Sequence, residues 1–160
     1  DNTGRNVFWG IYNVNLTTLP KFIIQPWDLD GTLGRTWDAI KIDPERGLGF
    51  DNGLILRNDA SSKYFRPFER IMNENPNNIK RRIYDRLMAV KDNALSPANM
   101  ASKVDYYKRQ IVESGALERD RQRWTGNSMY GYANPEEEAA YMKSWYTARL
   151  KYLESIFKDF

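Results

Sequence analysis

Two short apolar runs near the start of the chain predict a pair of β-strands. Val7 to Tyr12 is aromatic and β-branched, and Lys21 to Gln25 is a second run of the same kind. Side chains of these types favour strands, and the polar stretch 13–20 between the runs indicates a turn with a long loop. The sequence therefore predicts a small N-terminal β-hairpin.

Residues 30–60 follow a different pattern, because Gly, Asp and Asn are frequent and apolar residues occur only in brief pairs. This composition predicts a long irregular segment. In compact domains, segments of this length are usually functional or mobile.

The rest of the chain shows the spacing of helices. A first helix either begins near Pro67 or kinks there, and Asn75-Pro76 interrupts the pattern before a second helix. Ser96-Pro97 is a favourable start for a third helix, which Gly115 ends. The apolar stripe of the second helix is Ile79, Ile83, Tyr84 and Leu87, and that of the third is Val104, Tyr107 and Ile111.

A long terminal helix is predicted after Asn134-Pro135, because Asn is a good N-cap and Pro suits the first helical position. A Glu at the third helical position fits a capping box. Residues 119–132, before this helix, indicate a polar connector. We therefore predict a mainly α fold with a small N-terminal β-hairpin. The face of the terminal helix that turns inward carries Met142, Trp145, Arg149, Tyr152, Leu153 and Ile156.

The composition of the chain then limits which catalytic groups and metal sites it can contain. The 160 residues contain no histidine and no cysteine, which excludes imidazole bases, thiolate nucleophiles, disulfides and the usual zinc sites. The net charge of +3 is spread along the chain without a basic arm, so we expect no nucleic-acid partner. No run is apolar for long enough to span a membrane, and this stretch shows no signal peptide. Any catalysis must use carboxylates, other polar side chains or a bound metal.

The strongest chemical motif is Asp28-Leu29-Asp30-Gly31, which follows the second apolar run. Two carboxylates on a Gly-containing turn suit Mg²⁺, which prefers oxygen ligands and keeps several waters. Two other interpretations stay open. Asp and Gly form solvated turns for purely local reasons. The run Asp28 to Leu33 also resembles the first motif of haloacid-dehalogenase phosphatases, although the parallel βαβ pattern of those enzymes does not follow it.

A second pair of residues lies upstream, where Asp1 and Asn6 have the spacing of a protein-kinase catalytic loop. In such loops the Asp receives the substrate hydroxyl proton and the Asn binds a metal. A strand, a turn, a second strand and another Asp then follow in the order of a kinase C-lobe. The magnesium turn of kinases has glycine two positions after its aspartate; here Asp30 takes that position and Gly31 comes one later.

With these residues, the chain resembles the C-terminal lobe of the CotH family of atypical, secreted, spore-coat-type protein kinases. The match is carried by Trp27-Asp28-Leu29-Asp30-Gly31-Thr32-Leu33-Gly34 and by the upstream pair, and it extends to the downstream helices. The resemblance implies a single domain, 1–160, with a kinase-like C-lobe fold. Its parts would be a catalytic-loop and metal-binding hairpin at 1–34, an irregular activation-like segment at 35–60 and a helical bundle at 61–160.

The resemblance also implies phosphorylation of Ser/Thr in a Ser-rich protein, with ATP and Mg²⁺ or Mn²⁺, in a secreted or cell-envelope protein. Asp1 would be the catalytic residue, and Asn6, Asp28 and Asp30 would bind metal. Because the nucleotide-covering lobe lies outside this sequence, we expect the isolated chain to be inactive. A non-catalytic surface adhesin or coat-assembly scaffold with the same fold is an alternative. The substrate, the oligomeric state and the role of residues 115–133 are not determined by the sequence.

Overall fold

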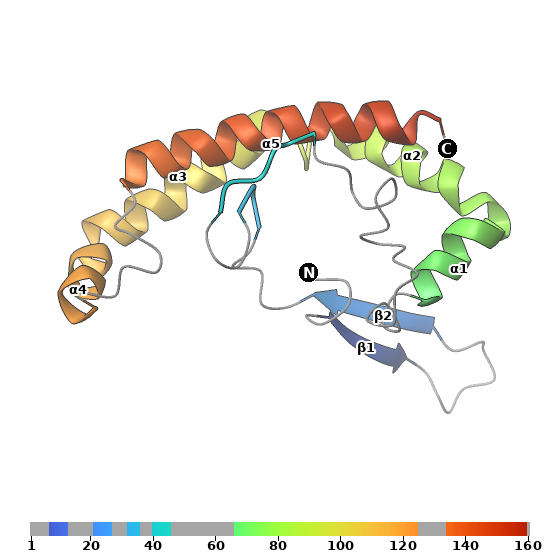
Figure 1. Cartoon of the computed structure of the whole chain (residues 1–160), viewed down its shortest axis with the longest axis horizontal. Coiled ribbons are helices and arrows are strands. Elements are labelled where there is room, and N and C mark those ends of the chain that lie inside the picture. Colours follow the sequence, from blue (N-terminus) through green and yellow to red (C-terminus); the bar gives the residue numbers. More distant parts are fainter. Residues whose placement is uncertain are drawn as a thin grey trace. The chain divides into compact units, whose positions relative to one another are not determined.

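The computed structural model describes residues 7–12, 21–26, 32–35, 40–45, 66–124 and 134–159. The described part is mainly helical with one pair of strands, as predicted (Figure 1). The chain divides into two compact units, residues 1–32 with 47–76 and residues 33–46 with 77–160. The elements are β1 (Val7–Tyr12), β2 (Lys21–Pro26), α1 (Arg66–Glu74), η2 (Pro76–Asn78), α2 (Ile79–Val90), α3 (Pro97–Glu113), α4 (Ala116–Arg123) and α5 (Pro135–Phe157).

The first unit contains the predicted strands, which pair antiparallel in a two-stranded sheet. The register joins the start of β1 to the end of β2, with Val7 opposite Pro26 and Tyr12 opposite Lys21. Proline has no N–H to donate to a ladder, so it suits the last position of β2. The helix predicted near Pro67 is α1, which begins one residue earlier, at Arg66.

The predicted interruption at Asn75-Pro76 is confirmed, and asparagine chemistry explains it. Asn75, Asn77 and Asn78 all have a positive φ, of 47°, 51° and 54°. Asparagine tolerates this left-handed conformation better than other side chains, because its short amide can bond locally. Three such residues together end α1 and separate it from α2.

The second unit is organised around α5, against which both α2 and α3 pack (Figure 1). Lys91 pairs with Glu154, and Lys108 pairs with Glu136. Residue numbers therefore rise along α2 and α3 while those of their partners on α5 fall. This order means that α2 and α3 run antiparallel to α5. Between them, the Tyr146 hydroxyl donates a 2.8 Å hydrogen bond to the Leu95 carbonyl.

The predicted apolar stripe of α3 is wrong. Tyr107 is 64% exposed and Ile111 is 49% exposed, whereas Val104 is partly buried. Ion pairs contribute to the contact with α5: Lys143 bonds to Asp105 at 2.9 Å and Lys108 bonds to Glu136 at 2.6 Å. Long lysine stems cover a helix surface while their charged ends find partners. This interface therefore needs fewer apolar residues than the spacing rule assumes.

The predicted connector at 119–132 is also corrected, because its first part belongs to α4. This helix starts after Gly115, whose φ of 71° allows the sharp change of direction from α3. Glu118 lies in its first turn and Arg121 and Arg123 in its last, an arrangement that complements the helix dipole. Charge placement therefore favours this helix despite its low apolar content.

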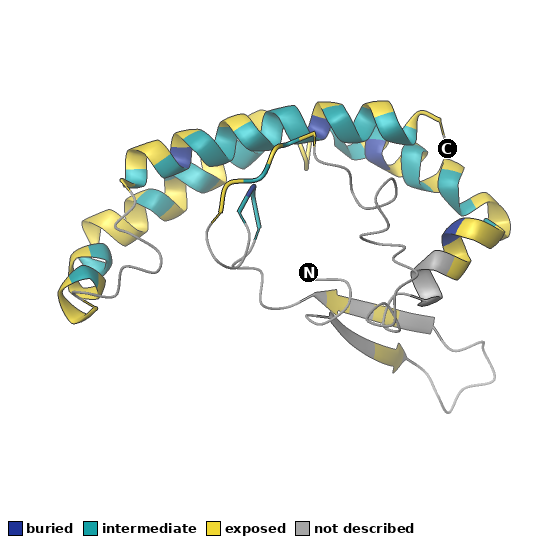
Figure 2. Ribbon diagram, viewed as in Figure 1, coloured by how far each residue is buried: buried dark blue, intermediate teal, exposed yellow. Residues whose placement is uncertain are grey.

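Both predicted helix caps are confirmed. The Ser96 side chain accepts from the Asn99 amide at the start of α3, and the Asn134 side chain accepts from the Glu136 amide at the start of α5. The core of the described part is small. Its buried hydrophobic residues are Met72, Leu87, Ala139 and Leu150 (Figure 2). In the described ranges, no helix combines the length and apolar character needed to cross a bilayer.

Candidate functional site

The four predicted site residues, Asp1, Asn6, Asp28 and Asp30, lie outside the described residues. Their neighbours in sequence are described. β1 begins directly after Asn6, and β2 ends two residues before Asp28. Within the ranges that the structure describes, no group of three or more acidic side chains is placed to hold a metal. The metal-site assignment therefore stays a prediction.

The best-defined arrangement of polar side chains is a stripe on α5, here called the α5 clamp: Glu138, Tyr141, Trp145 and Arg149. These residues follow at intervals of three and four, so they lie on one face of the helix. All four contact residues of the segment 33–45, which follows the Asp28-Asp30 turn in sequence. The α5 clamp thus joins the terminal helix to a segment about one hundred residues earlier in the chain.

Gly34 allows this segment to approach the helix closely. The Gly34 carbonyl accepts the Ile42 amide at 2.8 Å, and Arg35 forms an antiparallel bridge with Lys41. Gly34 has a φ of 92°, which L-residues rarely adopt. A Cβ at this position would lie 2.6 Å from Cγ of Trp145. Both the backbone conformation and the packing therefore require glycine here.

An ion pair joins Arg35 to Glu138 at the N-terminal end of the clamp. Nε of Arg35 donates to Oε2 of Glu138 at 2.8 Å, and Nη2 donates to Oε1. The two side chains are only 22% and 19% exposed, whereas the i,i+4 pair of Arg70 and Glu74 is 76% and 57% exposed. A bidentate pair in a partly dry environment is stronger than an exposed one. Arg35 thus fixes the segment to the first turns of α5.

The other three clamp residues bind backbone carbonyls. The Tyr141 hydroxyl lies 2.7 Å from the Gly34 carbonyl and 3.3 Å from the Ile42 carbonyl. Nε1 of Trp145 donates to Ile42 at 2.8 Å, and Nη1 of Arg149 donates to Pro44 at 2.8 Å. These bonds satisfy backbone carbonyls of Gly34, Ile42 and Pro44.

Aromatic rings surround the charged groups of the clamp. The Lys41 ammonium lies 4.6 Å from the centroid of the Tyr141 ring. The Arg149 guanidinium lies 5.8 Å from the Trp145 ring and 5.4 Å from the Tyr152 ring. Burial lowers the pKa of Arg149, because desolvation disfavours the charged form. Arginine nevertheless stays protonated at neutral pH, so this contact with Pro44 keeps its charge.

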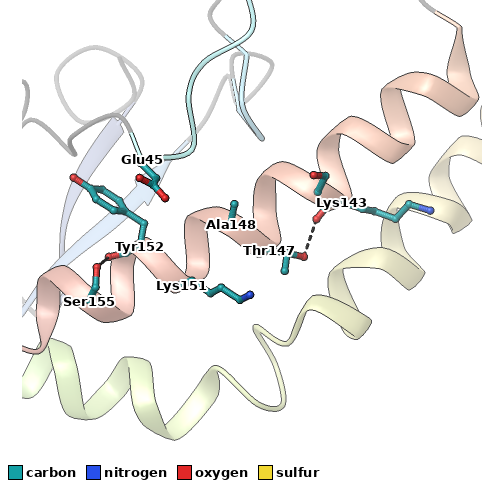
Figure 3. A pocket seen from close by; sticks show the side chains of 8 residues that line it. Glu45, Lys143, Thr147, Ala148, Lys151, Tyr152 and Ser155 are labelled. Atoms are coloured by element: carbon teal, nitrogen blue, oxygen red, sulfur yellow. Dashed lines mark hydrogen bonds between the residues drawn. The ribbon is translucent and has the colours of Figure 1, made fainter.

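An open groove of about 800 Å³ lies on α5 beside the clamp (Figure 3). Its lining includes Glu45, Lys143, Thr147, Lys151, Tyr152 and Ser155. The Thr147 hydroxyl is bonded to the Lys143 carbonyl, and the Ser155 hydroxyl to the Tyr152 carbonyl. Small-molecule pockets are usually mostly apolar and enclosed. The groove is open rather than enclosed, and we assign no ligand to it.

Sequence reasoning placed Trp145 and Arg149 on the inward face of the terminal helix but missed the clamp. The missed members are Glu138, Tyr141 and their partners Gly34 and Arg35. A signal was present, because Glu138, Tyr141, Trp145 and Arg149 mix polar and aromatic types at helical spacing. Such a stripe indicates a helix face of mixed polar and aromatic character, but it does not reveal which segment of the chain that face contacts.

The family model described as CotH kinase protein matches residues 1–153. Neither the curated proteins nor the solved structures give a significant match. The family match includes Asp1, Asn6, Asp28 and Asp30 as well as the whole α5 clamp. Since it spans nearly all of the 160 residues, the chain belongs to the CotH kinase protein family.

Proposed function

We propose that this chain is the C-terminal lobe of an ATP-dependent protein kinase that phosphorylates Ser/Thr in a secreted or cell-envelope protein. Asp1 is the catalytic base, and Asn6, Asp28 and Asp30 bind Mg²⁺ or Mn²⁺. The observation that carries the proposal is the family match over residues 1–153, which contains all four residues.

The strand register supports the proposed grouping of the metal ligands. Val7 pairs with Pro26, so Asn6 and the Asp28 turn are attached to the same end of the strand pair. Carboxylate and amide oxygens are also the ligand types that Mg²⁺ and Mn²⁺ prefer. Phosphoryl transfer needs positioning and charge neutralisation, and bound divalent ions supply the latter when present. This chemistry requires no histidine.

The phosphatase interpretation has less support. Haloacid-dehalogenase enzymes continue their first motif into a parallel βαβ sheet. In the part of the chain that the structure describes, the sheet is two-stranded and antiparallel, and the elements after it are helices.

The test is a labelling assay with a form of the protein extended upstream by its nucleotide-binding lobe. Radiolabelled ATP, Mn²⁺ and a Ser-rich peptide are incubated with wild type, Asp1→Ala, Asp28→Ala and the control Asp159→Asn. Asp159 is exposed and lies beyond the family match. We expect labelling by wild type and the control, and a loss of at least a hundredfold in the two site variants.

Three results would contradict the proposal. Full labelling by Asp1→Ala and Asp28→Ala would remove the site assignment. Absence of labelling in wild type would favour the adhesin or coat-assembly scaffold. Hydrolysis of an aryl phosphate by the 160-residue chain alone would favour the phosphatase, because that enzyme needs no second lobe.

A further inference from the structure

We propose that the exposed side of α3 binds the same side of α3 in a second copy of this chain, with the two helices antiparallel. The contact surface consists of Lys103, Tyr106, Gln110 and Glu113 and is here called the α3 seam. The proposal does not depend on the proposed kinase activity, because it assigns no role in catalysis or metal binding to these residues.

The two sides of α3 differ in exposure. Asp105 and Lys108 are partly buried and form ion pairs with Lys143 and Glu136 on α5. At 100° per residue, the α3 seam lies on the other side of the helix. All four of its residues are exposed, and exposed positions predominate along α3 (Figure 2). The side that faces α5 therefore has its partner, and the α3 seam is the side available to a second molecule.

The spacing of the α3 seam suits contact with another helix. Its residues follow at intervals of three, four and three positions, which is the repeat of a coiled-coil contact. Tyr106, within the stripe, is 49% exposed, and Tyr107 beside it is 64% exposed. Tyrosine is enriched at protein interfaces, because its ring supplies a large apolar area and its hydroxyl tolerates water. The seam thus combines an aromatic residue with polar and charged ones.

The charges of the α3 seam fit a second copy in one orientation. Within the ranges that the structure describes, neither the Lys103 ammonium nor the Glu113 carboxylate has an ion-pair partner. If Lys103 lies opposite Glu113 of the second copy, two-fold symmetry also places Glu113 opposite Lys103 of that copy. Tyr106 and Gln110, each three positions further in, then lie opposite each other. A parallel pair would place like charges together, so charge complementarity favours the antiparallel one.

The size of the α3 seam predicts a weak dimer. From Lys103 to Glu113 the helix rises about 15 Å, or roughly three turns. A contact of this length falls below the roughly 1,200 Å² of total buried area that stable complexes reach. We therefore expect a reversible equilibrium between monomer and dimer, with a dissociation constant in the micromolar range.

The test is sedimentation equilibrium of the 160-residue chain from low micromolar to near millimolar concentration. Lys103→Glu and Glu113→Lys each turn both attractive pairs into repulsive ones, and each should weaken association about tenfold. The variant with both substitutions restores opposite charges and should associate within twofold of wild type. The control is Lys151→Glu, the same charge change at an exposed position on α5, and it should leave association unchanged.

A mixture of the two single variants gives the sharpest result. One copy then carries Glu at both positions and the other carries Lys at both, so an antiparallel heterodimer regains two attractive pairs. The equimolar mixture should therefore associate about as strongly as wild type, although each variant alone does not. Helical circular dichroism of each variant confirms that the monomer is folded.

Three outcomes would overturn the proposal. If wild type stays monomeric up to near millimolar concentration, the α3 seam does not bind a second copy. If wild type dimerises but both single variants associate equally well, the dimer uses another surface. If the mixture associates no better than the single variants alone, Lys103 does not lie opposite Glu113 and the antiparallel register is wrong.

Discussion

Gly34→Ala is the substitution that examines the close approach between segment 33–45 and α5 most directly. Two costs are expected from the structure. A non-glycine residue at a φ of 92° costs about 1–2 kcal/mol. The new Cβ would also lie 2.6, 2.7 and 2.8 Å from three atoms of the Trp145 indole, and overpacking of this kind costs about 1–3 kcal/mol. The free energy of unfolding should therefore fall by roughly 2–5 kcal/mol.

The two costs can be separated by repeating the substitution in a Trp145→Ala background. That change removes the indole atoms but leaves the backbone conformation, so Gly34→Ala should then cost only about 1–2 kcal/mol. The difference between the two backgrounds is the steric part, about 1–3 kcal/mol. Urea unfolding, followed by the helical circular dichroism signal, gives both values.

Gly10→Ala is the matched control. Gly10 lies in β1, and a Cβ there would meet no atom within 4 Å. Removing glycine flexibility from the unfolded chain should leave stability unchanged or raise it by about 0.4–1 kcal/mol. An equal cost for Gly34→Ala in both backgrounds would refute the close approach of Trp145, and a cost no larger than that of Gly10→Ala would refute the backbone argument as well.

Three further predictions concern the helices of the second unit. The hydrogen bond from Lys143 lowers the pKa of Asp105, so this pair stabilises the fold above the ordinary carboxyl pKa and is lost as pH falls below about 4. Asp105→Asn should therefore melt lower than wild type at pH 7, and the difference should shrink as pH falls through the lowered pKa of Asp105; a pH-independent difference would contradict this. Asn134→Ala removes the cap on the Glu136 amide and should cost about 1 kcal/mol, while Asn134→Ser should retain most of it; equal losses by urea unfolding would argue against the cap. Leu150→Ala should cost about 2–5 kcal/mol because Leu150 is 9% exposed, and a change below 1 kcal/mol would show that this position is not core.

Local rules predicted much of this fold. Ser96-Pro97 and Asn134-Pro135 marked the starts of α3 and α5 because capping depends only on neighbouring residues. The strands were predicted to within one residue because strand propensity also depends on the local residue types. Two predictions, the apolar stripe of α3 and the connector at 119–132, failed because tertiary contacts or charges determine the structure there. Tyr107 and Ile111 are exposed because α3 meets α5 through ion pairs, and α4 forms although its apolar content is low.

The clamp lay beyond the reach of such rules. Its partners are separated by 99 to 107 positions, and four of its hydrogen bonds end on backbone carbonyls, which every residue has. The residue types in segment 33–45 therefore do not predict which backbone carbonyls accept hydrogen bonds from Tyr141 or Arg149. The metal ligands present the opposite case: Asp28 and Asp30 are visible in sequence, and the family match includes them, but their geometry is not described.

Recognition of main-chain oxygens has a consequence for protein engineering. Three clamp side chains, those of Tyr141, Trp145 and Arg149, donate hydrogen bonds to backbone carbonyls of the loop. These bonds do not depend on the identity of most side chains in the loop. An exposed position such as Ile40 should therefore accept diverse substitutions, or carry a grafted epitope, while the loop remains bound to the helix.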